Sequence, residues 1–193
     1  TKHAEPANFE YTKQFDACNH FVEDDAKSMI DFYRKIAPLL ERIWIYNGDT
    51  DPSVSFEGTR TAVKRFGFPE VVGGSYRPWF YNHSAVDERV LREKVIAFGP
   101  DLNLQGEGAQ FGGEVVNYEH DVTFLTVHGS GHLVPKFRPQ AALHLITKFV
   151  NYQELSPVLP SNDTLLAMND EEFAVAMDKW TEEAKGSPYV AEL

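Results

Sequence analysis

Two short motifs constrain this chain more than any other feature, because each directly follows a run that is typical of a buried strand. Residues 47–51 read Asn-Gly-Asp-Thr-Asp and follow Arg-Ile-Trp-Ile-Tyr at 42–46. Residues 128–135 read His-Gly-Ser-Gly-His-Leu-Val-Pro and follow Val-Thr-Phe-Leu-Thr-Val at 122–127. Short runs of β-branched and aromatic residues indicate buried parallel strands. The motifs therefore place carboxylates and imidazoles at the carboxyl ends of two strands, where open α/β sheets hold their active sites.

An aspartate followed much later by a histidine is two thirds of a catalytic triad. In α/β hydrolases the triad runs Ser, Asp, His along the chain, and the serine lies in a G-x-S-x-G turn. No G-x-S-x-G sequence occurs here. The sequence therefore predicts an α/β chain that carries the acid and the base of a triad without its nucleophile. Such a chain is not a competent hydrolase on its own.

Further motifs make a family resemblance specific. Taken in order and spacing, the chain is similar to the C-terminal half of the serine carboxypeptidase family, and this similarity runs from about residue 15 to residue 152. The motifs that carry it lie at 43–51, 76–80 (Tyr-Arg-Pro-Trp-Phe), 110–115 (Gln-Phe-Gly-Gly-Glu-Val), 124–135 and 138–139 (Arg-Pro).

The resemblance assigns roles within the two motifs. It implies that Asp51 is the triad acid and His132 the triad base, whereas Asp49 is structural and His128 a loop residue. Such a base needs a buried carboxylate on its other ring nitrogen to fix the tautomer and stabilise the imidazolium. A metal site built from Asp49, Asp51 and His132 is conceivable, but the triad pattern is favoured, and we expect neither a metal nor another cofactor.

Residues that flank the two motifs are candidates for contact with substrate. We expect Val54, Leu133 and Trp79 to line the pocket for the leaving residue, with an apolar preference. The implied activity is release of C-terminal amino acids from peptides through an acyl-enzyme. Since fold and triad do not fix the substrate, an acyltransferase, a hydroxynitrile lyase or a non-catalytic stabilising subunit remain alternatives.

Too few strands are visible to close a hydrolase sheet. Besides the two runs above, only weaker extended stretches occur, at 95–98 and 114–118. We therefore expect the C-terminal part of an α/β-hydrolase fold with an incomplete central sheet, completed by an N-terminal chain. The family resemblance implies a heavy chain cut from the same precursor, with the single cysteine, Cys18, in a disulfide to it. A buried free thiol and a chain truncated from a longer protein are the competing explanations.

Composition narrows the cellular setting. The net charge of −11 argues against a nucleic-acid partner, which demands clustered Lys and Arg. No apolar run approaches the length of a membrane span. The sequons at Asn82 and Asn162 fit glycosylation in the secretory pathway, and we expect a lysosomal, vacuolar or extracellular protein.

Helical periodicity organises the rest of the chain. It predicts helices at 24–40, 55–66 and 138–150, and a turn at 71–76 that leads into a short antiparallel ribbon. We divide the chain into the carboxypeptidase-like part, residues 1–155, and a C-terminal extension, residues 156–193. In the extension, Asn169 and Glu172 form a predicted capping box, and Phe173, Met177 and Trp180 share a face suited to docking.

Overall fold

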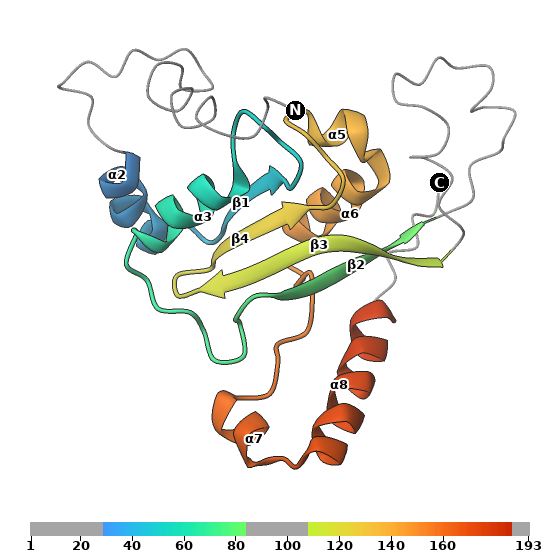
Figure 1. Cartoon of the computed structure of the whole chain (residues 1–193). Coiled ribbons are helices and arrows are strands. Elements are labelled where there is room, and N and C mark those ends of the chain that lie inside the picture. The colour runs from blue at the N-terminus through green and yellow to red at the C-terminus, as the bar shows by residue number, and fades with distance from the viewer. Residues whose placement is uncertain (1–28, 84–107, 187–193) are drawn as a thin grey trace, which may run out of the picture.

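A computed structural model describes residues 29–83 and 108–186, which form four strands and seven helical segments (Figure 1). The elements are, in chain order, α2 (Met29–Ile36), the 3-10 helix η1 (Ala37–Leu39), β1 (Ile43–Gly48), α3 (Phe56–Lys64), β2 (Arg77–His83), β3 (Gly108–Tyr118), β4 (Val122–Val127), α5 (Val134–Phe137), α6 (Pro139–Val150), α7 (Asn162–Ala167) and α8 (Asp170–Lys185).

The strands form one mixed sheet in the order β1-β4-β3-β2. β1 and β4 are parallel, whereas β4 with β3 and β3 with β2 are antiparallel. The α/β class predicted from the sequence is confirmed. The predicted ribbon is the β2–β3 pair, and the stretch predicted at 114–118 is the end of β3. The stretch at 95–98 lies outside the described residues.

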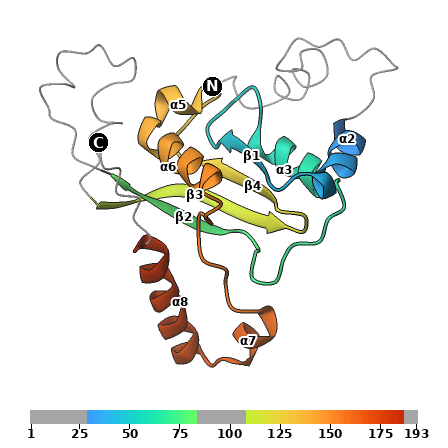
Figure 2. The same ribbon diagram turned by 180° about the vertical axis from the view of Figure 1, so that it is seen from behind.

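Helices cover both faces of this sheet, as the two opposite views show (Figures 1 and 2). β4 is buried along its whole length, and its side chains alternate between the two cores, as the two-residue period of a strand requires. Leu125 and Val127 pack toward α6, while Val122 and Phe124 pack toward α2 and α3. A strand buried on both faces explains why residues 122–127 read as a nearly continuous apolar run.

β1 differs from β4 because it has a neighbour on one edge only within the described part of the chain. Its composition, Ile-Trp-Ile-Tyr, is that of a buried strand, yet these residues are only half-buried and Tyr46 is 45% exposed. Exposed apolar side chains also occur on α2, on η1 and directly after η1, namely Met29, Phe32, Leu39 and Leu40. The β1 edge is thus the least covered apolar surface of the described sheet.

The helices predicted from periodicity are present with shorter bounds. The 55–66 prediction corresponds to α3 and the 138–150 prediction to α6. The described portion of the 24–40 prediction is α2 followed by η1, and the change to a tighter helix begins just before Pro38. The capping box of α8 is confirmed, since Asn169 accepts from the Glu172 N–H and the Glu172 carboxylate accepts from the Asn169 N–H.

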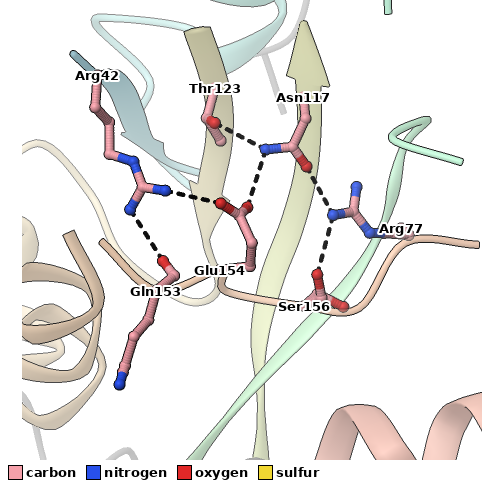
Figure 3. A network of polar contacts seen from close by, with 7 residues as sticks. All are labelled: Arg42, Arg77, Asn117, Thr123, Gln153, Glu154 and Ser156. Carbon is pink, nitrogen blue, oxygen red and sulfur yellow. Dashed lines mark hydrogen bonds and ion pairs between the residues drawn. The ribbon is translucent and has the colours of Figure 1, made fainter. Parts of the chain in front are cut away.

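The segment after α6 is fastened to the sheet by Arg77, whose side chain is buried at the start of β2 (Figure 3). Its Nε donates to the Pro157 carbonyl at 2.7 Å, and its Nη2 donates to the Ser156 carbonyl at 3.1 Å and to Asn117 Oδ1 at 2.7 Å. Farther along, Trp180 Nε1 on α8 donates to the Val158 carbonyl. The proposed boundary at 155/156 remains a prediction, and the helices on its two sides, α6 and α8, both contact β2.

Replacing Arg77 by methionine keeps much of the side-chain volume but removes these donors. The buried acceptors that Arg77 satisfies would lose a charged partner, so we expect the full-length protein to lose roughly 3 kcal/mol of unfolding free energy. Urea unfolding measures this loss. The matched control is Arg60→Met, because the Arg60–Glu57 pair lies on the exposed face of α3 and should be worth below about 1 kcal/mol. Equal losses in the two variants would contradict this account of Arg77.

His144 on α6 is buried against the sheet, where its ring stacks on Trp79 with centroids 6.1 Å apart. Burial, helped by the nearby positive charge of Lys148, lowers the pKa of His144 from 6.5 to about 4. Between about pH 4 and pH 6.5, the His144 ring is therefore protonated in the unfolded chain but neutral in the folded chain. The contribution of His144 to stability is complete above about pH 6.5 and falls as the pH falls toward 4.

Replacing His144 by methionine should remove this part of the pH dependence. Between pH 7 and pH 4.5 the wild-type protein should lose about 2 to 3 kcal/mol of unfolding free energy through His144 alone. The drop in unfolding free energy should accordingly be smaller by that amount in His144→Met. Chemical denaturation at both pH values measures it, and an unchanged drop would show that His144 is not held neutral by burial.

Candidate active site

Strand register brings the two motifs to the same edge of the sheet. β1 and β4 are parallel, and their last residues, Gly48 and Val127, are directly opposite each other. The turns that follow these strands therefore begin level with one another. Two backbone hydrogen bonds join them: the Asp49 N–H donates to the Val127 carbonyl at 3.1 Å, and the Thr50 N–H donates to the Ser130 carbonyl at 3.0 Å.

Gly48 allows this close approach of the two turns. A Cβ added at Gly48 would overlap the backbone of Ser130 and Gly131. Because only glycine lacks that atom, a larger residue would push the His132 loop away from β1. The glycine that precedes the two aspartates is thus a requirement of the packing.

Asp51 and His132 meet across the joined turns. His132 Nδ1 lies 3.0 Å from Asp51 Oδ2, while the other carboxylate oxygen, Oδ1, accepts the backbone N–H groups of Ser53 at 2.8 Å and Val54 at 3.1 Å. The two side chains differ sharply in exposure, at 2% for Asp51 and 65% for His132. The carboxylate is thus held in a fixed orientation under a largely exposed imidazole.

The hydrogen bonds of Asp51 also determine its charge. Burial alone would raise its pKa, but the backbone N–H groups of Ser53 and Val54 and the side chain of His132 outweigh that effect, so the pKa lies below its usual value of 3.8. An ionised carboxylate can only accept hydrogen bonds. A neutral His132 ring therefore carries its proton on Nδ1, which leaves Nε2 as the basic nitrogen. This is the tautomer that a triad base requires.

A second acid–imidazole pair lies beside the first. Asp49 Oδ2 is 2.7 Å from His128 Nδ1, and Asp49 Oδ1 accepts the Gly129 N–H at 2.7 Å. Sequence reasoning assigned Asp49 a structural part and His128 no specific one, and it missed their contact. The sequence did contain a signal for this contact. Parallel strands that bring Asp51 to His132 also bring together the earlier residues of the same two turns, Asp49 and His128.

The predicted substrate-contact residues fall into two groups. Val54 and Leu133 flank the pair: Val54 is half-buried and donates to Asp51, whereas Leu133 follows His132 and is 52% exposed. The side chain of Trp79, the third predicted contact residue, is fully buried in the α6-side core, and its part in substrate binding stays a prediction. Its Nε1 donates to the Thr126 carbonyl, and its ring fills the space beside Gly112, where a Cβ would collide with it. Within the described part of the chain, Trp79 therefore acts as a core residue beside the candidate site.

Other predicted features have a simpler outcome. Asn82 and Asn162 are exposed on β2 and α7, so their side chains are open to modification. Cys18 lies outside the described residues. Across residues 29–83 and 108–186, no group of three or more His, Cys, Asp and Glu side chains is arranged to hold a metal ion. None of the helices in these ranges has the length and hydropathy needed to cross a bilayer.

Comparison with known proteins identifies the family. A family model described as serine carboxypeptidase matches residues 3–152, which is more than three quarters of the chain. The chain belongs to the serine carboxypeptidase family. Its mixed sheet is consistent with a partial α/β-hydrolase fold, so the predicted family and fold class are both confirmed.

The alignments with individual serine carboxypeptidase relatives cover most of this chain but only a small part of each relative. Serine carboxypeptidase-like 33 of Arabidopsis thaliana is 35% identical over 136 residues, which are 70% of this chain and 22% of that protein. Serine carboxypeptidase-like 38 of the same plant is 29% identical over 154 residues, or 77% of this chain and 26% of that protein. Serine carboxypeptidase 1 of Hordeum vulgare is 30% identical over 131 residues, or 68% and 20%. The chain spans about a fifth to a quarter of the length of these curated relatives.

Proposed function

We propose that this chain supplies the acid and the base of a serine carboxypeptidase and that another part of the enzyme supplies the nucleophilic serine. The observation that carries the proposal is the contact between Asp51 and His132 at the carboxyl ends of two parallel strands. An oriented, ionised carboxylate beneath an exposed imidazole suits general base catalysis. Membership of the family supports the same reading.

The proposed reaction follows from the tautomer of His132. Nε2 takes the proton of the serine hydroxyl as the serine oxygen bonds to the carbonyl carbon of the last peptide bond. Asp51 stabilises the imidazolium that forms. The imidazolium then passes the proton to the amine of the departing C-terminal amino acid as the peptide C–N bond breaks. In the second half, His132 deprotonates a water molecule that hydrolyses the acyl-enzyme and restores the serine.

The β1 edge supports the proposal that the rest of the enzyme packs there. One apolar groove beside β1 is lined by Met29, Ile30, Tyr33 and Ile45. A second groove of mixed character is lined by Leu39, Leu40, Phe149 and Val150 together with Glu41, Arg42 and Tyr152. Exposed apolar surface of this extent favours a protein partner. We propose that the partner is the N-terminal part of the same precursor, which continues the sheet beyond β1 and is joined through Cys18.

Substrate contact and location follow as parts of the same proposal. Val54 and Leu133 flank the Asp51–His132 pair, and their apolar side chains suit a hydrophobic leaving residue. The exposed sequon asparagines Asn82 and Asn162 support passage through the secretory pathway to a lysosome, a vacuole or the exterior. A glycan on either asparagine, detected by mass spectrometry, would test that route.

The roles of Asp51 and His132 can be tested in the full-length enzyme with a blocked dipeptide. His132→Ala should lower kcat by roughly 10³-fold or more, the effect of losing a triad member. Asp51→Asn should preserve the geometry but favour the wrong tautomer, lowering the rate about 10⁴-fold. Both variants should keep a native melting profile. Retention of tens of per cent of the wild-type rate would exclude the assigned role. A product acylated on an added alcohol, in place of hydrolysis, would instead indicate an acyltransferase.

The need for a partner can be tested by expressing the chain alone. Because the sequence contains no G-x-S-x-G turn and β1 has no neighbour on its outer edge within the described residues, the isolated chain should hydrolyse no blocked dipeptide and should unfold readily. Co-expression with the segment that contains the nucleophilic serine should restore turnover. Carboxypeptidase turnover by the purified chain alone would contradict the proposal, and a stabilised complex without turnover would indicate a non-catalytic subunit.

A further inference from the structure

The Asp49–His128 pair braces the loop that carries His132. His128 and Gly129 are the first two residues of that loop, and the Asp49 carboxylate contacts both, through the His128 ring and the Gly129 N–H. The backbone N–H of Asp49 also holds Val127, the last residue of β4. A single aspartate in the β1 turn thus contacts three consecutive residues at the start of the loop.

The same end of the loop is held from the opposite side by Arg138, which precedes α6. Arg138 Nε donates to the His128 carbonyl at 3.0 Å, and its guanidinium occupies the space that a Cβ on Gly129 would fill. Gly129 has a φ of +65°, which glycine adopts without strain. The ring of Phe111 on β3 lies against His128, with centroids 5.1 Å apart. His128 is therefore fixed at its carbonyl, its ring and its ring nitrogen.

Contacts between the two turns follow one another in order. Asp49 contacts residues 127–129, Thr50 holds Ser130, and Asp51 meets His132. Only the last contact involves the triad, and His132 itself is 65% exposed. An exposed imidazole has little packing of its own to keep it in place, so its position depends on how firmly the preceding residues are held.

We propose that Asp49 and His128 form a positioning pair for His132, so that the Asp51–His132 contact is present before substrate binds. The inference rests on the proposed role of Asp51 and His132 and assigns no contact with reacting atoms to Asp49 or His128. Small displacements of a catalytic group are costly, since misplacement by about 1 Å can cost 10²-fold in rate. Weakening the Asp49–His128 contact, with Asp51 and His132 both intact, should therefore lower kcat and leave KM nearly unchanged.

Replacing His128 by leucine removes the donor to Asp49, whereas asparagine keeps a donor near the position of Nδ1. In the full-length enzyme His128→Leu should lower kcat about tenfold, and His128→Asn should recover to within about threefold of wild type. Asp49→Asn is a second way to disrupt the same contact, and its effect should not add to that of His128→Leu, because residues in one network act together. His120→Asn, an exposed histidine at the opposite end of β4, should behave as wild type.

A spectroscopic readout separates positioning from a general loss of stability. The downfield proton resonance of His132 Nδ1–H, in its bond to Asp51, should broaden in His128→Leu and return in His128→Asn, with all variants folded by melting curves. Wild-type kcat in both His128→Leu and Asp49→Asn, equal damage in the leucine and asparagine variants, or an effect on KM alone would overturn the proposal. Measuring Asp51→Asn in parallel separates a failure of the positioning pair from a failure of the proposed Asp51–His132 acid–base pair. If Asp51→Asn abolishes turnover while His128→Leu does not lower it, only the positioning pair fails, whereas an active Asp51→Asn refutes the proposed dyad itself.

Discussion

The parallel pairing of β1 with β4 is the constraint on which the site depends. Its register sets Gly48 opposite Val127, and every contact between the two turns follows from that alignment. A shift of one residue would turn every side chain of β4 to the opposite face of the sheet. Since β4 is buried on both faces, such a shift would disrupt both cores. The packing that stabilises the sheet therefore also fixes the distance between Asp51 and His132.

The two edges of the sheet differ in the kind of side chain that lies there. Near the β2 edge, Arg77 donates to the carbonyls of Ser156 and Pro157 and to Asn117, and Asn117 and Glu154 extend this network toward Arg42 (Figure 3). The contacts of Arg77 are buried or half-buried, whereas those of Glu154 are exposed, and the buried ones fix one geometry because unsatisfied alternatives are costly. The β1 edge instead presents apolar side chains, and within the described ranges β1 has no strand neighbour on that edge. This asymmetry supports the proposal that the catalytic fold continues beyond β1.

Within the site, the proposed acid and the proposed base differ in burial. Asp51 is enclosed and satisfied by two backbone N–H groups as well as by His132, which keeps it ionised. In the proposed function His132 exchanges a proton with a serine outside this chain, so it has to stay accessible and packing cannot hold it. The backbone bonds between the turns and the Asp49–His128 contact supply the restraint that burial would otherwise provide. A His132 side chain that is held in place but left exposed is also consistent with a site that another part of the enzyme completes.

Much of the fold was predictable because it depends on local sequence. The apolar run of β4, the helical period of α6 and the Asn169–Glu172 capping box each carry their own signal. The edge position of β1 agreed with the expectation of an incomplete sheet, and the family motifs singled out Asp51 and His132. These features are encoded in residues near one another in the chain or in a short ordered motif.

What the sequence did not reveal depends on contacts between distant segments. Trp79 belongs to a strong motif, but a register shift between Trp79 and Phe80 and the absence of a side chain on Gly112 seat its ring in the core. The Asp49–His128 contact needs the register of two strands far apart in sequence. By itself the sequence determined the family, the strand and helix types and the pair of residues suited to acid and base chemistry. Only the tertiary structure decided which side chains are enclosed and which carboxylate meets which imidazole, because strand register and burial arise when separate segments pack together.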